Sequence, residues 1–226
     1  MVGDIEPAAT LALLERHLAG LPRECGEPVA PQVSAPAAPP EAPVRIAIPD
    51  KEQVEIVVAT PGVSRAEPGF EAYAVANFLF GGSFVSRLNL RLRDREGITY
   101  GAQSTIVSGR HPGFWYASAG VHPEKVERAV ALTLEEMRRL ADAGVTAEEL
   151  ALAQQHLTGS FPIRLETNRA IGSVLLESER FGRGLDYIDR YPERIRALTV
   201  EQVSAAARGL IDPSRAVTAV AGSFAD

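Results

Sequence analysis

Several features are scarce or missing in this 226-residue sequence. It has one cysteine, Cys25, so no disulfide can form within the chain, and the polar, proline-bearing surroundings favour an idle thiol over a catalytic one. No uninterrupted apolar run is long enough to cross a bilayer, which predicts no membrane span. The first residues show no basic segment followed by an apolar core, so no signal peptide is visible. These absences leave the compartment open, with a slight preference for the cytoplasm.

Positive charge is also in short supply. Lys and Arg number 23 against 29 Asp and Glu, which gives a formal net charge of -6 and a pI near 5.4. Because phosphate binding requires a basic surface, this balance argues against nucleic acid as the main partner. The hydrophobic content of 46% and the charged content of 23% are those of an ordinary globular protein.

The histidines do not form a metal-binding pattern. A zinc peptidase needs histidines that share a helical face, and a glutamate that activates water. None of the four histidines has another histidine three or four residues away; they are His17, His111, His122 and His156. The sequence therefore predicts structural roles for all four, and no metal or other cofactor bound by this chain.

Other catalytic patterns are missing too. The pair Gly81-Gly82 precedes a predicted helix, but the lysine and the spacing of a phosphate-binding P-loop are absent. Ser160 and Ser173 lie in predicted helices, and the sequence places no histidine to activate them. We therefore interpret the glycine pair as a helix connection, and no nucleophile is evident.

Strands and helices are predicted in blocks rather than in strict alternation. Alternating apolar residues predict several strands, over 44–48, 54–58, 114–121 and 216–221. Amphipathic helices are predicted after Pro123 and after two capping boxes, Thr146 with Glu149 and Thr199 with Gln202. Such blocks favour an α+β fold, a two-layer sandwich whose largely antiparallel sheet is covered on one face by helices.

Composition divides the chain into three regions. Residues 44–226 hold most of the predicted elements and form the main domain. Residues 22–43 are rich in proline and alanine. Because proline fixes its own backbone angle and lacks an amide donor, this segment predicts an extended, semi-rigid linker. Residues 1–21 contain a helix with apolar residues at helical spacing, such as Leu11 and Leu14.

The segment between the glycine pair and residue 100 predicts a helix followed by a strand. The two glycines provide backbone freedom for a sharp turn. Leu88 and Leu92 then share one helical face, and Gly97 is placed to end the helix. Residues 98–100 alternate as in a half-buried strand.

This geometry allows Arg93, in the last helical turn, and Tyr100, near the start of the strand, to point into one cleft. Structural roles are the alternative, and physical signals alone favour them. An arginine in a last turn usually interacts with solvent and the helix dipole. A tyrosine in a strand is usually a core residue with a hydrated hydroxyl.

The run from Gly69 to Ser104 resembles the second, zinc-free domain of the insulinase/pitrilysin family of metallopeptidases, in particular its processing-peptidase branch. The resemblance extends over most of residues 44–226, and the segment 93–100 is its most specific part. The residues that carry it are Gly81-Gly82-Ser83, Ser86-Arg87-Leu88, Leu92-Arg93, Gly97-Ile98-Thr99-Tyr100 and Ser104.

The resemblance implies that Arg93 and Tyr100, seven positions apart, hold a peptide substrate near the scissile carbonyl. It also implies that Gly81, Gly82 and Ser83 contribute to substrate binding. Zinc is expected in a partner, a zinc-bearing domain of the same family on the same polypeptide or on a separate subunit. Without that partner, this chain should be inactive.

A function of another class stays open, that of a catalytically inert scaffold similar to the core proteins of the respiratory bc complex. The Arg93 and Tyr100 pair favours the peptidase half, because a pure scaffold does not need it. Residues 1–21 resemble the end of the family's preceding, zinc-bearing domain; the alternative is an ordinary N-terminal helix.

Overall fold

The computed structural model describes residues 1–22 and 42–224 of the protein. The predicted linker over 22–43 lies outside the described residues except at its two ends, so the predicted domain boundaries stay predictions. Helix α1 (Pro7–Leu18) precedes this gap, and none of its residues is buried.

A five-stranded sheet forms one layer of the fold. Across the sheet the strands follow the order β1-β5-β2-β4-β3, in which β1 pairs in parallel with β5 and every other pair is antiparallel. This arrangement confirms the predicted α+β sandwich with a largely antiparallel sheet. The strands are β1 (Val44–Ala47), β2 (Val54–Pro61), β3 (Ala102–Val107), β4 (Phe114–Val121) and β5 (Val217–Gly222).

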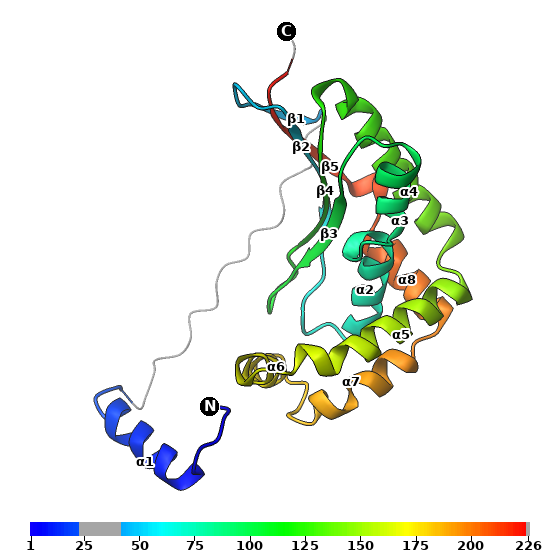
Figure 1. Ribbon diagram of the computed structural model, residues 1–226. Coiled ribbons are helices and arrows are strands. Elements are labelled where there is room, and N and C mark those ends of the chain that lie inside the picture. The colour runs from blue at the N-terminus through cyan, green and yellow to red at the C-terminus, as the bar shows by residue number, and fades with distance from the viewer. Residues whose placement is uncertain (23–41, 225–226) are drawn as a thin grey trace.

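Helices form the second layer and lie on one face of the sheet (Figure 1). α4 contacts β2 and β4, α2 contacts β3, and α8 packs against both helices. The α-helices of this layer and its extension are α2 (Phe70–Asn77), α3 (Arg87–Asn89), α4 (Val126–Ala143), α5 (Ala147–Arg164), α6 (Asn168–Arg180), α7 (Tyr187–Arg196) and α8 (Val200–Leu210). Shorter helical turns are η1 (Phe78–Gly82), η2 (Leu90–Arg95), η3 (Pro123–Lys125) and η4 (Pro213–Arg215).

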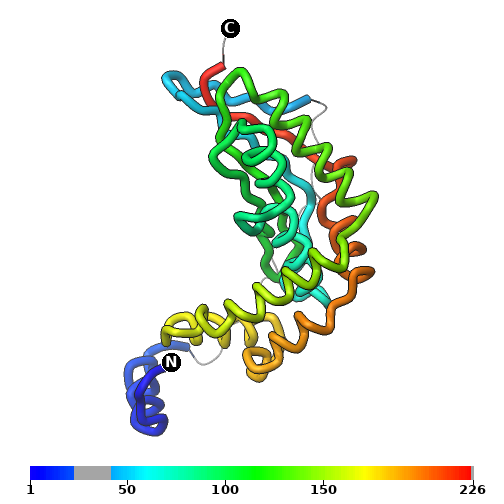
Figure 2. Tube along the Cα trace, turned by 45° about the vertical axis from the view of Figure 1, so that its right-hand side comes forward, coloured from blue at the N-terminus to red at the C-terminus, as the bar shows by residue number. Residues whose placement is uncertain are grey.

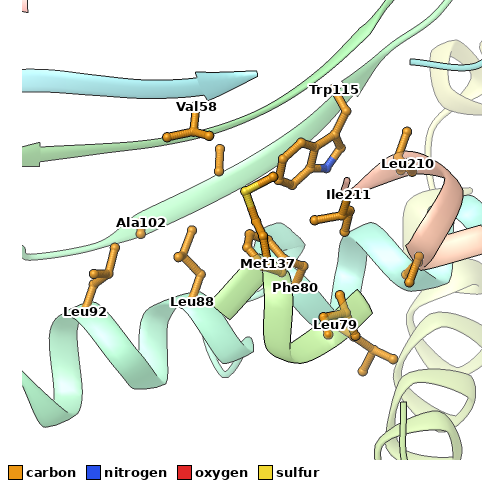
Figure 3. Close-up of a cluster of buried hydrophobic side chains, with 14 of the residues drawn as sticks. Val58, Leu79, Phe80, Leu88, Leu92, Ala102, Trp115, Met137, Leu210 and Ile211 are labelled. Atoms are coloured by element: carbon orange, nitrogen blue, oxygen red, sulfur yellow. The ribbon is translucent and has the colours of Figure 1, made fainter. Parts of the chain in front are cut away.

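The core lies between the two layers. Along β2, every second residue from Val54 to Val58 is fully buried toward the helices, as the alternating pattern predicts. Figure 3 shows Val58 and Trp115 from the sheet above Met137 and Phe80 from the helical layer. Phe80 and Trp115 meet edge to face, with ring centroids 5.3 Å apart.

Capping boxes begin two of the helices, as predicted. The Thr146 hydroxyl accepts from the Glu149 N–H at 3.1 Å, and the Glu149 carboxylate accepts from the Thr146 N–H at 2.8 Å. Thr199 and Gln202 form the same pair of bonds before α8.

α5 continues beyond the sheet, where it meets α6 and α7 (Figure 2). No helix in the described parts of the chain is both long and apolar enough to cross a membrane.

Candidate functional site

The helix that ends at Gly97 consists of α3 and the π-helical turn η2. Leu88 and Leu92 are buried and hold it against the core. Gly97 has a φ of 62°, a value that favours glycine. Its N–H donates to the Arg93 carbonyl at 3.1 Å, and the Ile98 N–H donates to the Leu92 carbonyl at 3.0 Å. The prediction that Gly97 ends this helix is confirmed.

The predicted strand over 98–100 is wrong, because β3 begins only at Ala102. The β3–β4 ladder starts at Ala102, and before it the Thr99 hydroxyl bonds the Gly120 carbonyl oxygen at 2.9 Å. At Ala102 the outward backbone groups are bound by Asn89, whose side chain is buried. Its carbonyl oxygen accepts from the Ala102 N–H at 2.9 Å, and its amide donates to the Ala102 carbonyl at 2.7 Å. The side chain thus takes the place of a neighbouring strand at the edge of the sheet. Alternation within 98–100 carries no information about this contact.

Asn77 acts similarly one pair further along the same edge. Its amide donates to the Ser104 carbonyl at 3.3 Å, while its carbonyl oxygen accepts from the Ser104 hydroxyl and from the Trp115 indole, both at 2.8 Å. No pattern in the sequence pointed to either asparagine. An asparagine on the apolar side of a helix is the signal that could have found them, because a buried amide needs partners.

Gly81, Gly82 and Ser83 line a cavity of about 440 Å³ beside β3 and β4. Neither glycine has a positive φ, and both belong to η1, so backbone freedom for a sharp turn is not the reason for them. Close approach is the reason at Gly81: a Cβ there would lie 2.8 Å from the Ser104 backbone nitrogen. Gly101 lines the same cavity.

Tyr100 lies in the bend before β3 and is 90% exposed. The bend is held by Thr99, whose hydroxyl lies 2.9 Å from the Gly120 carbonyl oxygen and 2.8 Å from the Gly101 carbonyl oxygen. Tyr100 lines a second cavity of about 430 Å³, together with residues such as Gln53. Its side chain is therefore free while its backbone is fixed from both sides.

Arg93 is engaged within its own helix. Its guanidinium donates to the Asp94 carboxylate at 2.7 and 3.2 Å, and its carbon lies 3.6 Å from the centroid of the Phe84 ring. It also donates to the Phe84 carbonyl at 3.3 Å. Hydrogen bonding from Arg93 lowers the pKa of Asp94, so the carboxylate is ionised at neutral pH. One guanidinium nitrogen, Nη1, is buried and lacks a hydrogen-bond partner among the described residues.

The structure therefore brings the predicted site residues together only in part. Gly81, Gly82 and Ser83 line one cavity. Tyr100 lines a different cavity, and Gly120 lines both. Arg93 lines neither of them in this conformation. The expectation that Arg93 and Tyr100 point into one cleft therefore stays a prediction.

The described residues do not fit a zinc site. No group of three or more His, Cys, Asp or Glu side chains among them is arranged to hold a metal ion. His156 instead stacks on Phe78, with ring centroids 5.0 Å apart, and Nδ1 of His122 accepts from the Glu124 N–H at 3.4 Å.

The sequence matches a known protein family. The family model described as the peptidase M16 inactive domain matches residues 1–157. The chain belongs to this family. The predicted metallopeptidase kinship is thereby confirmed, and with it the assignment to the inactive domain of the family.

Relatives agree with this assignment. An uncharacterized zinc protease of Streptomyces coelicolor is 28% identical over 160 residues, which cover 71% of this chain and 35% of the relative. A crystal structure of a peptidase M16 inactive domain from Pseudomonas fluorescens is 26% identical, with a TM-score of 0.86 over 99% of this chain and 52% of that one. The chain spans less than half the length of the curated relatives that cover most of it.

A likeness in fold alone extends further. A chain of complex III2 from Candida albicans has a TM-score of 0.76 at 19% identity, over 97% of this chain and 53% of that one. The fold of this chain is thus similar to that of a chain in this complex.

Proposed function

We propose that this domain is the zinc-free half of a two-domain metalloendopeptidase, and that it holds a peptide substrate against a zinc-bearing half. The zinc-bearing half belongs to the same polypeptide or to a separate subunit. Membership of the peptidase M16 inactive domain family supports this pairing, as does the greater length of the Streptomyces coelicolor relative named as a zinc protease. Residues 1–21 would then be the end of the zinc-bearing domain, and residues 22–43 the linker between the halves.

The observation that carries the substrate-holding role is the exposure of Tyr100. Because the Tyr100 side chain is 90% exposed, it adds little to the stability of its own domain. It can, however, reach a ligand or a facing domain. Its hydroxyl would donate a hydrogen bond to the scissile carbonyl oxygen. Such a donor accelerates cleavage when it is aimed at the charge that grows on this oxygen in the transition state.

Arg93 is the proposed second donor, and its present contacts show which of them must change when a substrate binds. The orphaned Nη1 group is a donor without an acceptor, and leaving a buried polar group unpaired costs free energy. A substrate carbonyl would satisfy that group once the Phe84 ring moves aside. Arg93 would keep its bond to Asp94, which fixes the orientation of the guanidinium.

The cavity lined by Gly81, Gly82 and Ser83 is the proposed seat for the peptide backbone. Glycines allow a second chain to approach closely, since they present no side chain to it. Gly101 connects this cavity to the position of Tyr100, so a peptide lying there would pass beside the proposed donor.

The test uses the complete two-domain enzyme and the substitution Tyr100→Phe. Losing one donor aimed at the transition state should reduce turnover by about 100- to 1,000-fold. Stability should stay unchanged, because the hydroxyl is exposed. Tyr73→Phe removes a hydroxyl from a half-buried tyrosine of α2 and serves as the matched control. Normal turnover of Tyr100→Phe would refute the substrate-holding role.

An inert scaffold is the second candidate function. It is supported by the likeness in fold to the Candida albicans complex III2 chain. The two functions differ in their partner: a peptidase half needs a domain with a His-x-x-Glu-His motif, and a scaffold does not. Absence of peptide cleavage by the purified complete protein with zinc present would favour the scaffold.

A further inference from the structure

A third cavity lies at the far end of the helical layer, away from the residues of the proposed substrate site. It has a volume of about 220 Å³ and is lined by residues of α2, of the loop before it, and of α5, α6 and α7. These last three helices lie below the sheet in Figure 1. The cavity walls include the apolar side chains of Leu157, Phe161 and Val174. The charged groups around it decide what it can bind.

The one buried carboxylate of this cavity is already saturated. Glu71 accepts from Arg194 at 3.0 and 3.2 Å and from the Tyr187 hydroxyl at 3.0 Å. Burial by itself would raise the pKa of Glu71, but the hydrogen bonds from Arg194 and Tyr187 lower it below the ordinary value. Glu71 is therefore an ionised group whose charge Arg194 balances, so it does not neutralise the other arginines around the cavity.

The cavity keeps a surplus of positive charge. Arg65 is paired with Glu177 at 2.9 Å. Arg183 donates only to neutral acceptors, the Arg65 carbonyl at 2.7 Å and the Tyr187 hydroxyl at 3.2 Å. Arg164, the last residue of α5, makes no ion pair or side-chain hydrogen bond within the described parts of the chain. Two of the three lining guanidinium groups thus lack an anionic partner there.

Tyr191 adds a neutral donor to these two cations. Its ring packs on Phe161 with centroids 4.3 Å apart, and its hydroxyl has no hydrogen-bond partner among the described residues. Burial raises the pKa of Tyr191, whereas the positive charges of Arg164 and Arg65 lower it in part. The phenol therefore stays protonated at neutral pH and can donate a hydrogen bond.

We infer that this cavity binds a small molecule or peptide end that carries one carboxylate attached to an apolar group. Arg164 and the Tyr191 hydroxyl would bind the carboxylate, because both are donors without an acceptor. The apolar walls would cover the attached group. A neutral ligand would leave the cationic surplus unbalanced, and a fully hydrated dianion would gain nothing from the apolar walls.

The test measures binding of N-acetyl-L-leucine to the full chain by calorimetry or NMR titration, with N-acetyl-L-leucinamide as the neutral control ligand. Saturable binding of the acid is expected, with the amide weaker by about tenfold or more. Arg164→Gln should weaken binding of the acid by about tenfold or more, since it removes a charged donor. Arg169→Gln, an exposed arginine of α6 outside the cavity, should leave it unchanged.

Two further arms make the result decisive. Tyr191→Phe should weaken binding of the acid less than Arg164→Gln does. Thermal unfolding of each variant checks that it is folded. A tripeptide that ends in leucine identifies the source: tighter binding than N-acetyl-L-leucine assigns the site to a peptide end, and weaker binding assigns it to a small acid. Equal binding of acid and amide, indifference to Arg164→Gln, tighter binding of inorganic phosphate, or no saturable binding would overturn the proposal.

Discussion

The edge of β3 and the bend just before it are built in opposite ways. At the edge, Asn77 and Asn89 bind the backbone of Ser104 and Ala102, and every one of these four residues is buried or half-buried. In the bend, Tyr100 is 90% exposed. The comparison shows that an exposed side chain directly precedes a strand edge whose backbone is bound by buried amides.

The largest expected effect is on the rigid side. Asn89→Ala leaves the N–H and carbonyl of Ala102 without partners in the interior. Each unpaired buried group costs about 1–3 kcal/mol, so the free energy of unfolding should fall by about 2–4 kcal/mol. Denaturant unfolding measures this. Asn168→Ala, at an exposed position of α6, is the control. Equal losses for the two variants would mean that Asn89 does not hold the edge.

Gly81→Ala is expected to come next. The new Cβ would lie 2.8 Å from the backbone nitrogen of Ser104, so strands and helix must shift, at a cost of about 1–3 kcal/mol. Gly159→Ala in α5 is the matched control, because a Cβ there meets nothing within 4 Å. That control should stabilise the protein by about 0.5–1 kcal/mol. Thermal unfolding that shows the same sign for both would contradict the close approach at Gly81.

Phe84→Ala tests the contact between the Phe84 ring and the Arg93 guanidinium. An exposed contact between a cation and an aromatic ring contributes about 0.5–1 kcal/mol, and the stability should fall by about that amount. Val85→Ala, at the equally exposed neighbouring position, is expected to have little effect. A loss for Phe84→Ala no greater than that of Val85→Ala would show that the ring does not hold the guanidinium in solution.

Tyr100→Phe should have the smallest effect on stability, within about 0.5 kcal/mol, as is usual for an exposed position. The same substitution is expected to reduce turnover strongly in the complete enzyme. The contrast between the two measurements sharpens the comparison. A drop in stability of the isolated domain would place the Tyr100 hydroxyl in a structural contact and remove the contrast.

Local patterns were sufficient for much of the fold. The capping box of Thr146 with Glu149 and the helix end at Gly97 could be predicted, because each depends on residues within a few positions of one another. The order of the strands could not. β5 lies between β1 and β2, and this pairing joins the two ends of the main domain. It depends on the packing of the whole sheet.

The residues proposed for the candidate site stay a prediction, and their arrangement could not be predicted. These residues followed from the resemblance to a known family, which concerns residue types and spacing. The contact of Arg93 with the Phe84 ring and the late start of β3 at Ala102 depend on side-chain packing, which the spacing does not encode. The cavity near Arg164 joins segments that are distant in the sequence, and no local motif marks it.

The asparagine contacts at β3 have a consequence for how the protein behaves at high concentration. β3 is the last strand on its side of the sheet, and the free edge of a sheet is a template onto which another chain can add a strand. At Ala102 and Ser104 the outward carbonyls are already bound by amide side chains. An incoming strand would have to displace them first, so this edge carries its own protection against edge-to-edge aggregation.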